Sequence, residues 1–256
     1  MGADTKSFDR TRVAVGQPIA HDSARLHVSG QASYTDDIPE PRGLLHLAIG
    51  ISDKAHARIR SIDLSAVTAS PGVADVLLAS DIPGDNNFGP IIHDDPILVE
   101  DTALYAGHPL FAVVAKDVDT ARRATGRAVV EYEELPAILD TDTAIGESSF
   151  VLPNREVTRG DPVAAIEAAP HRIRKRVTTG GQDQFYLEGH VAMAVPGERD
   201  ALTIYSSTQH PDEVQTLVAR ATSRDAKDIV VICRRLGGAF GGKESQAALL
   251  ACLVAL

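Results

Sequence analysis

Residues 228–256 read DIVVICRRLGGAFGGKESQAALLACLVAL, and this stretch sets the architecture of the second half of the chain. The β-branched run from Ile229 to Cys233 predicts a strand, and the apolar run from Glu244 onwards predicts a helix. Between them lies the loop GGAFGG, Gly237 to Gly242, beside a helix start whose backbone N–H groups lack partners. Four glycines in six residues let the main chain approach a ligand closely. The pattern indicates an anion-binding loop, with a tight turn that holds no ligand as the alternative.

Two known phosphate-binding loops are excluded by the residues around these glycines. Gly237, Gly242 and Lys243 match the spacing G-x-x-x-x-G-K, but a nucleotide P-loop needs Ser or Thr next to hold Mg²⁺. This chain has Glu244 there, an anion that would face the nucleotide's own negative charge. The dinucleotide pattern G-x-G-x-x-G is not matched at any spacing in the loop. What remains is a loop whose amides clasp a partly anionic ligand beside the flat ring of Phe240.

Glu244 supports two interpretations. It adds an ionisable group next to the loop, where a ligand would lie. It is equally an ordinary carboxylate at a helix N-terminus, where the helix dipole stabilises it by a few tenths to about 1 kcal/mol.

Gln209 is the second candidate site residue. It lies in SSTQH, Ser206 to His210, at the predicted end of a strand, where open α/β sheets usually contact their ligands. Its amide offers both a donor and an acceptor, although an isolated Gln in a loop is usually only solvated. A serine hydrolase is excluded because the chain has no G-x-S-x-G elbow, and His190 and His210 lack the spacing of a zinc site.

Hydrophobic periodicity predicts two α+β units of the fold, residues 1–145 with an N-terminal arm and residues 146–256. Asp117 caps a predicted helix, and the stretch from Thr141 to Asp161 has the composition of a linker. We expect each unit to bury its own core. The expected strands and extended runs are residues 44–51, 73–79, 110–115, 129–139, 171–179, 185–195 and 201–207, and the other expected helices are residues 117–130 and 210–222.

Composition excludes several classes of protein. The net charge of -10 argues against a nucleic-acid binder, because neutralising phosphates requires clustered Lys and Arg. No stretch approaches the roughly 18 apolar residues that span a bilayer, and the N-terminus lacks a secretory signal. Cys233 and Cys252 form no CxxC pair, which fits a reducing compartment, the cytoplasm by default, and excludes an iron–sulfur cluster held by this chain alone.

Several separated segments, taken together, resemble the molybdenum hydroxylases, and the xanthine dehydrogenases among them most closely. The resemblance implies an α/β-hammerhead domain over residues 1–145, followed by the first part of a mixed α/β molybdopterin-binding domain over residues 146–256. The fold class is α+β. The segments that carry the resemblance are VGQPIAHDSARLHVSGQASYTDDIP (15–39), YAGHPLFAVVA (105–115), VEYEELPAILD (130–140), GGQDQFYLEGH (180–190), YSSTQHP (205–211) and RRLGGAFGGKESQ (234–246).

The resemblance also implies roles for four residues. In that family a pyranopterin holds the molybdenum without a covalent protein ligand, and a Gln that corresponds to Gln209 hydrogen-bonds to the metal's terminal ligands. Backbone amides that correspond to Phe240 and Gly241 approach the molybdenum end of the cofactor, and Glu244 corresponds to a Glu that faces the substrate. Ala239 is a departure, because the family commonly has a third glycine there, and this puts the backbone of the loop in question.

The implied reaction is hydroxylation of hypoxanthine and xanthine to urate. Electrons would pass to 2Fe-2S clusters and FAD on a partner subunit of a hetero-oligomer, and from there to NAD. The family's general base is a Glu further along its chain, and this sequence ends at Leu256 within an apolar helix. We therefore expect a truncated product, a split subunit or a fragment that is inactive by itself.

Two alternatives stay open. The nearest is an aldehyde- or carbon monoxide-oxidising relative, and Glu244 separates it from the purine enzymes, because aldehyde-oxidising members tend to have an apolar residue there. The other is a catalytically silent fragment that only docks the iron–sulfur subunit through its N-terminal domain.

Overall fold

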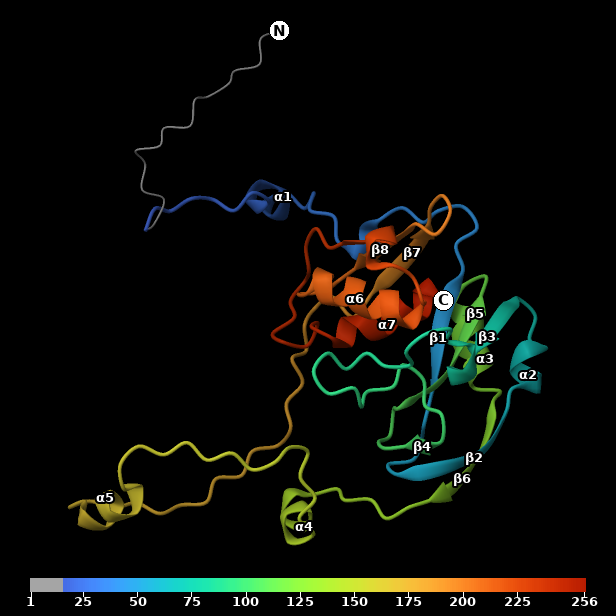
Figure 1. Ribbon diagram of the computed structural model, residues 1–256. Helices are drawn as coiled ribbons and strands as arrows, with labels where there is room; N and C mark the ends of the chain where they lie inside the picture. Colours follow the sequence, from blue (N-terminus) through green and yellow to red (C-terminus); the bar gives the residue numbers. More distant parts are fainter. Residues whose placement is uncertain (1–15) are drawn as a thin grey trace.

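The computed structural model describes residues 16–256 (Figure 1). The first part of the expected N-terminal arm, residues 1–15, lies outside the described residues. The first half of the chain forms two antiparallel three-stranded sheets. In strand order, one sheet contains β1 (His46–Ile51), β5 (Pro109–Ala115) and β3 (Val73–Leu77), and the other contains β4 (Thr102–Ala103), β2 (Ala57–Asp63) and β6 (Val129–Glu134).

The degree of burial explains which of these strands could be predicted from the sequence. Strand β5 pairs on both sides, with β1 and β3, and six of its seven residues are buried, so it reads as one apolar run. Strand β2 has only one fully buried residue, Ala57, and its arginines Arg58 and Arg60 alternate with apolar residues. We did not predict β2, because its sequence lacks an apolar run.

Helix α3 (Val118–Thr125) packs on β1 and β5. The Asp117 carboxylate accepts a hydrogen bond from the Thr120 backbone N–H at 2.6 Å, which is the N-cap predicted from the sequence. Ala121 and Ala124 are buried against the sheet. Two short helices of the first half are α1 (Ala24–Val28) and α2 (Ser65–Thr68).

The second half is a three-stranded sheet with two helices. Strand β7 (Ala192–Pro196) pairs antiparallel with β8 (Leu202–Ser206), which pairs in parallel with β9 (Ile229–Ile232). Helix α6 (Pro211–Ala221) connects β8 to β9, and α7 (Gln246–Ala255) packs on both α6 and β7. The predictions of a strand, a helix and a strand at residues 201–207, 210–222 and 229–233 are confirmed.

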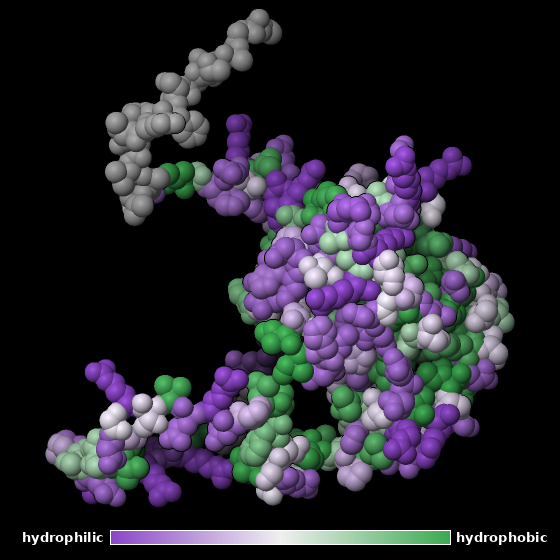
Figure 2. Space-filling view, in the orientation of Figure 1, coloured by the Kyte–Doolittle hydropathy of each residue, from purple (hydrophilic) through white to green (hydrophobic). Residues whose placement is uncertain are grey.

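Between the halves, residues 136–183 project from the body of the molecule (Figure 1), and nearly all of them are exposed. They contain α4 (Thr141–Gly146), which lies within the stretch that we had taken as a linker, and α5 (Pro162–Ala168), which follows that stretch and was not predicted. The strand predicted at residues 171–179 is wrong: its apolar residues Ile173 and Val177 are exposed, and no strand within residues 16–256 pairs with it. The strand predicted at residues 185–195 begins only at Ala192. Several large apolar side chains of this segment are exposed, among them Phe150, Val151, Val157 and Val163. Figure 2 shows hydrophobic surface on the part of the molecule that contains α4 and α5.

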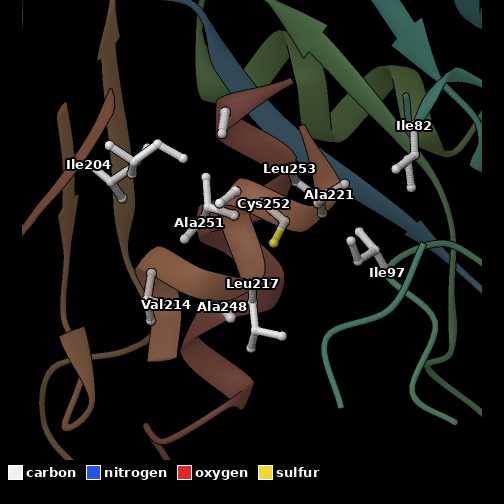
Figure 3. Packing of buried hydrophobic residues seen from close by; sticks show 14 of the residues in the cluster. Ile82, Ile97, Ile204, Val214, Leu217, Ala221, Ala248, Ala251, Cys252 and Leu253 are labelled. Atoms are coloured by element: carbon white, nitrogen blue, oxygen red, sulfur yellow. The ribbon is translucent and has the colours of Figure 1, made fainter. Parts of the chain in front are cut away.

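The main hydrophobic core joins the two halves (Figure 3). Ile82, Ile97 and Leu98, from a long loop of the first half, pack with residues of α6, α7, β8 and β9. The expectation of two separate cores is therefore incomplete, because only a smaller cluster around Val67, Leu110 and Phe111 belongs to the first half alone. Among residues 16–256, none of the helices has the length and apolar composition needed to cross a membrane.

Candidate functional site

The site lies where β8 and β9 end. These strands are parallel neighbours, so their carboxyl ends meet at one edge of the sheet. Ser207, Thr208 and Gln209 follow β8, and the glycine loop follows β9. The Gln209 backbone N–H donates to the Lys243 carbonyl at 2.8 Å, and the Thr208 hydroxyl donates to the same carbonyl at 3.1 Å.

Three of the four predicted site residues meet at this edge. The Gly241 backbone N–H donates to the Gln209 side-chain oxygen (Oε1) at 3.0 Å, and Phe240 precedes Gly241. Because a backbone N–H is the donor, the accepting atom of Gln209 is its oxygen, and the amide nitrogen (Nε2) is left as a donor. Among residues 16–256 no acceptor is bonded to this nitrogen, and Gln209 is exposed.

The loop glycines serve two different purposes. A Cβ on Gly237 would lie 2.6 Å from Cβ of Glu188, and a Cβ on Gly242 would lie 2.9 Å from the ring of Tyr186. Glycine is therefore required at these two positions because the loop packs closely against the segment that contains Tyr186 and Glu188. We had predicted instead that the glycines allow the main chain to approach a ligand. Gly241 has a φ of 85° and open space where a Cβ would be.

Ala239 fits the loop. Its side chain is buried, and the left-handed backbone conformations fall at Gly238, Phe240 and Gly241. A methyl group at position 239 therefore meets no backbone restriction, which removes the question raised by the missing third glycine. Phe240 adopts a φ of 52°, rare for a residue with a side chain, and the residue is 75% exposed.

Glu244 lies between the loop and α7 and is half-buried. Helix α7 begins at Gln246, two residues later than we predicted, with Ser245 at its N-cap. Glu244 therefore precedes the cap, and the first turn of α7 contains no acidic residue. Because the dipole effect falls off within the first turn, this position weakens the interpretation of Glu244 as an ordinary helix-start carboxylate.

A buried polar cluster beneath the loop was not predicted. The Lys243 side chain is fully buried, and its amino group donates to Glu188 Oε2 at 3.1 Å and to Ser207 Oγ at 2.8 Å. The same nitrogen lies 4.7 Å from the centre of the Tyr186 ring. We had considered Lys243 only as a P-loop lysine. Its position in a loop flanked by apolar strand and helix was the signal that it is buried.

Glu188 is the anion of this cluster. Burial would raise the pKa of its carboxyl, but hydrogen bonds from the Gly237 backbone, the Ser207 hydroxyl and Lys243, with the charge of Lys243, outweigh burial and lower the pKa below its usual value. Glu188 is therefore ionised at neutral pH. The ionised Glu188 carboxylate contributes to the free energy of unfolding at pH values above the usual carboxyl pKa. This contribution is lost as the pH falls through the lowered pKa of Glu188 in the folded protein.

His190 and Tyr186 complete the cluster. The Tyr186 hydroxyl and His190 Nε2 are 2.6 Å apart. Burial, and then the charge of Lys243, lower the pKa of His190, so its ring is neutral at pH 7. The surroundings of Lys243 therefore contain one carboxylate and no second cation.

Two family models match the chain. Residues 29–136 match the aldehyde oxidase and xanthine dehydrogenase a/b hammerhead domain, and residues 147–256 match the molybdopterin cofactor-binding domain. The xanthine dehydrogenase of Oryza sativa subsp. japonica is 39% identical over 98% of this chain and 19% of that protein. The xanthine dehydrogenase/oxidase of Gallus gallus is 37% identical over 94% of this chain and 18% of its own length. The chain thus spans about a fifth of the length of the curated relatives it matches.

Solved structures have the same fold. Quinoline 2-oxidoreductase from Pseudomonas putida 86 superposes with a TM-score of 0.78 at 26% identity, over 93% of this chain and 32% of that one. The aldehyde oxidoreductase from Desulfovibrio gigas superposes with a TM-score of 0.74 at 26% identity, over 90% of this chain and 28% of that one. Both the hammerhead domain and the cofactor-binding domain are therefore present in the predicted order.

Proposed function

Since the chain belongs to the molybdenum hydroxylases, the family of the aldehyde oxidases and xanthine dehydrogenases, we propose that it forms part of the cofactor site of a purine hydroxylase. The reaction is the conversion of hypoxanthine and xanthine to urate. The observation that carries this proposal is the hydrogen bond between Gln209 and Gly241 at an open sheet edge. Gly241 is followed two residues later by the buried Lys243 and three residues later by Glu244.

The residues present fit a molybdenum–molybdopterin cofactor. Gly241 borders open space, Phe240 has a left-handed backbone conformation, and Gln209 keeps an unbonded amide donor. This set offers hydrogen-bond donors to a partly anionic group and no protein atom that would ligate a metal. Gln209, Phe240 and Gly241 would hold the metal end of the cofactor. If the Gly241 N–H donates to the cofactor, it gives up its hydrogen bond to Gln209.

The bound cofactor supplies the two-electron oxidation of the substrate carbon. The chain's own contribution to the reaction is at Glu244, which we assign to the purine. A protonated carboxyl donates to a ring nitrogen of the purine, and an ionised carboxylate accepts from a ring N–H. Either bond orients the ring and stabilises charge that develops on it. The general base of the reaction is not assigned to any residue of this chain.

The remaining parts of the proposal concern the assembly. We place the domain boundary between residues 145 and 146, and we assign electron transfer to 2Fe-2S clusters and FAD on a partner subunit, with NAD as the acceptor. A cytoplasmic hetero-oligomer follows from this arrangement. These assignments are supported by the curated relatives, which are 37–41% identical to this chain and are all named as xanthine dehydrogenases.

An aldehyde-oxidising enzyme is the second candidate, because the aldehyde oxidoreductase from Desulfovibrio gigas has the same fold. Molybdenum analysis and substrate turnover of the full protein separate the two. We expect close to one molybdenum per chain and urate formation from xanthine that exceeds aldehyde oxidation. Molybdenum with a clear preference for aldehydes would support the second candidate, and a full protein that never carries molybdenum would refute both.

A further inference from the structure

The feature that the proposed reaction does not use is the buried cation beneath the loop. The amino group of Lys243 contacts Glu188 and Ser207, while its backbone carbonyl accepts hydrogen bonds from Thr208 and Gln209. Lys243 therefore contacts three consecutive residues after β8, Ser207 through its side chain and Thr208 and Gln209 through its main chain. One of the three is Gln209, whose side chain in turn binds Gly241.

Glu188 fixes the other end of the loop. Its Oε2 atom accepts from the Gly237 backbone N–H at 2.7 Å and from the Ser207 hydroxyl at 2.6 Å, in addition to Lys243. The Glu188 backbone N–H also donates to the Gly237 carbonyl at 3.3 Å. The ion pair thus ties the first glycine of the loop, the residue after the last glycine and the end of β8 to one carboxylate.

This cluster is a costly way to stabilise a turn. The Glu188 side chain is 10% exposed and that of Lys243 is fully buried, so both charges have lost most of their water. The second oxygen, Glu188 Oε1, and His190 Nδ1 are buried without a hydrogen-bond partner among the described residues. Apolar residues of similar volume often stabilise a fold as well as a buried ion pair does. What the pair adds is a fixed position for the groups that it contacts.

We propose that Lys243 and Glu188 are positioning residues, whose buried ion pair holds Gln209 and Gly241 in the arrangement that receives the cofactor. The inference deepens the proposed function and rests on it, since it concerns the same site. Neither residue is assigned a contact with substrate or cofactor. Groups that orient the contacts of a metal site cost about 10- to 100-fold in metal affinity or activity when they are removed.

The test compares variants of the full protein. Lys243→Met removes the cation and keeps an unbranched side chain. Two controls accompany it. Lys54→Met breaks the partly exposed pair of Lys54 with Glu134 in the first half of the chain. Leu217→Ala opens a cavity in the core at α6, touches none of the hydrogen bonds of the loop, and serves as a variant of reduced thermal stability.

Two readouts are taken, molybdenum per folded chain and hydrogen exchange of the Gly237 and Gly241 amides. We expect Lys243→Met to lose about tenfold or more of its molybdenum and to exchange these amides faster, while both controls keep wild-type values. Equal molybdenum in Lys243→Met and Leu217→Ala, with unchanged amide exchange, would overturn the proposal. The exchange of the amides is read even if the wild type carries no molybdenum, so failure of the proposed function is recognised separately.

A double variant keeps the proposal testable if the Lys243→Met protein does not fold. Glu188→Gln combined with Lys243→Met leaves no unpaired buried charge, so thermal stability is expected to recover. If the pair positions the loop, molybdenum stays low and the two amides still exchange fast. Recovery of stability, molybdenum and amide protection together would show that the pair acts through stability alone and would refute the proposal.

Discussion

At the scale of single residues, Gln209 has two hydrogen-bonding functions that a substitution removes together. Its oxygen accepts from the Gly241 N–H, and its nitrogen is the donor that we assign to the cofactor. Both are available because Gln209 lies just after β8, where the backbone is held by Lys243. The residue type and its place at a strand end were visible in the sequence.

We predict that Gln209→Ala in the full protein lowers turnover and leaves the fold intact. One charge-assisted hydrogen bond is worth about 1.5–3 kcal/mol, or roughly 10- to 150-fold in rate if it is made only in the transition state. The matched control is Gln215→Ala on α6, whose Gln amide bonds to the Ala226 and Ile229 carbonyls. That control should lose stability without losing turnover per molybdenum. Wild-type turnover of Gln209→Ala at full molybdenum occupancy would count against the assignment.

The residues that sequence reasoning missed are those that depend on distant neighbours. Glu188 and Lys243 are 55 positions apart, and only the folded chain shows that they form an ion pair. By contrast, Phe240, Gly241 and Glu244 stand within one short pattern, so they could be singled out as candidates. The same limit applies to Gly237, whose role in packing against Glu188 is invisible until the partner is placed.

At the scale of elements, the end of α6 depends on a loop from the other half of the chain. The backbone N–H groups of Gly84 and Asp85 donate to the carbonyls of Ala221 and Arg220, each at 3.0 Å. These carbonyls belong to the last turn of the helix, where intrahelical partners run out, although the Arg220 carbonyl also accepts from the Ser223 backbone N–H at 3.3 Å. A Cβ on Gly84 would lie 1.8 Å from the Arg220 carbonyl oxygen, so only glycine allows this approach.

Gly84→Ala is therefore predicted to move the loop away from α6 and to leave polar backbone groups unpaired. Of the residues in these two hydrogen bonds only Ala221 is buried, so its carbonyl is the group that loses its partner at a cost of about 1–3 kcal/mol, and denaturant unfolding should show a loss of that size. Gly146→Ala is the control, because Gly146 is in helix α4 and a Cβ there meets no atom within 4 Å. That change should be neutral or slightly stabilising. Equal stability of the two variants would contradict the capping role of the loop.

Periodicity predicted the elements that are buried on one face and missed those whose residues are exposed. Strand β5 and helix α6 are buried and were predicted, whereas β2 and the helices α4 and α5 were not. The caps of the two small helices were nevertheless readable, since Asp140 and Asp161 accept from the backbone N–H groups of Thr143 and Ala164. We did not consider these caps in the sequence, nor the proline in the first turn of α5.

At the scale of the whole molecule, the two domains are not independent bodies. Ile97 and Leu98 of the first half are fully buried in the same cluster as Leu253 and Val214 of the second. Such a shared core arises from contacts between residues far apart in the sequence, and no local pattern reveals it. The hammerhead domain therefore contributes to the core that supports the carboxyl ends of β8 and β9, where we propose that the cofactor binds.

The isolated chain is nevertheless predicted to have no turnover with xanthine. It spans about a fifth of the length of the curated relatives, and we assign the general base to none of its residues. Purified residues 1–256 can be assayed for urate formation and for molybdenum. Stoichiometric molybdenum together with measurable urate from this chain alone would contradict the prediction.

The central claim is that this site acts on a purine through Glu244, and the specificity of Glu244→Val in the full protein tests it most directly. Glu244 precedes the N-cap of α7, so loss of its carboxylate should cost little stability. A site built to pair a polar group discriminates strongly, so kcat/KM for xanthine should fall on the order of 100-fold or more while aldehyde oxidation holds or rises. Equal losses for xanthine and aldehyde, in proportion to lost molybdenum, would contradict the claim and assign Glu244 to the cofactor loop.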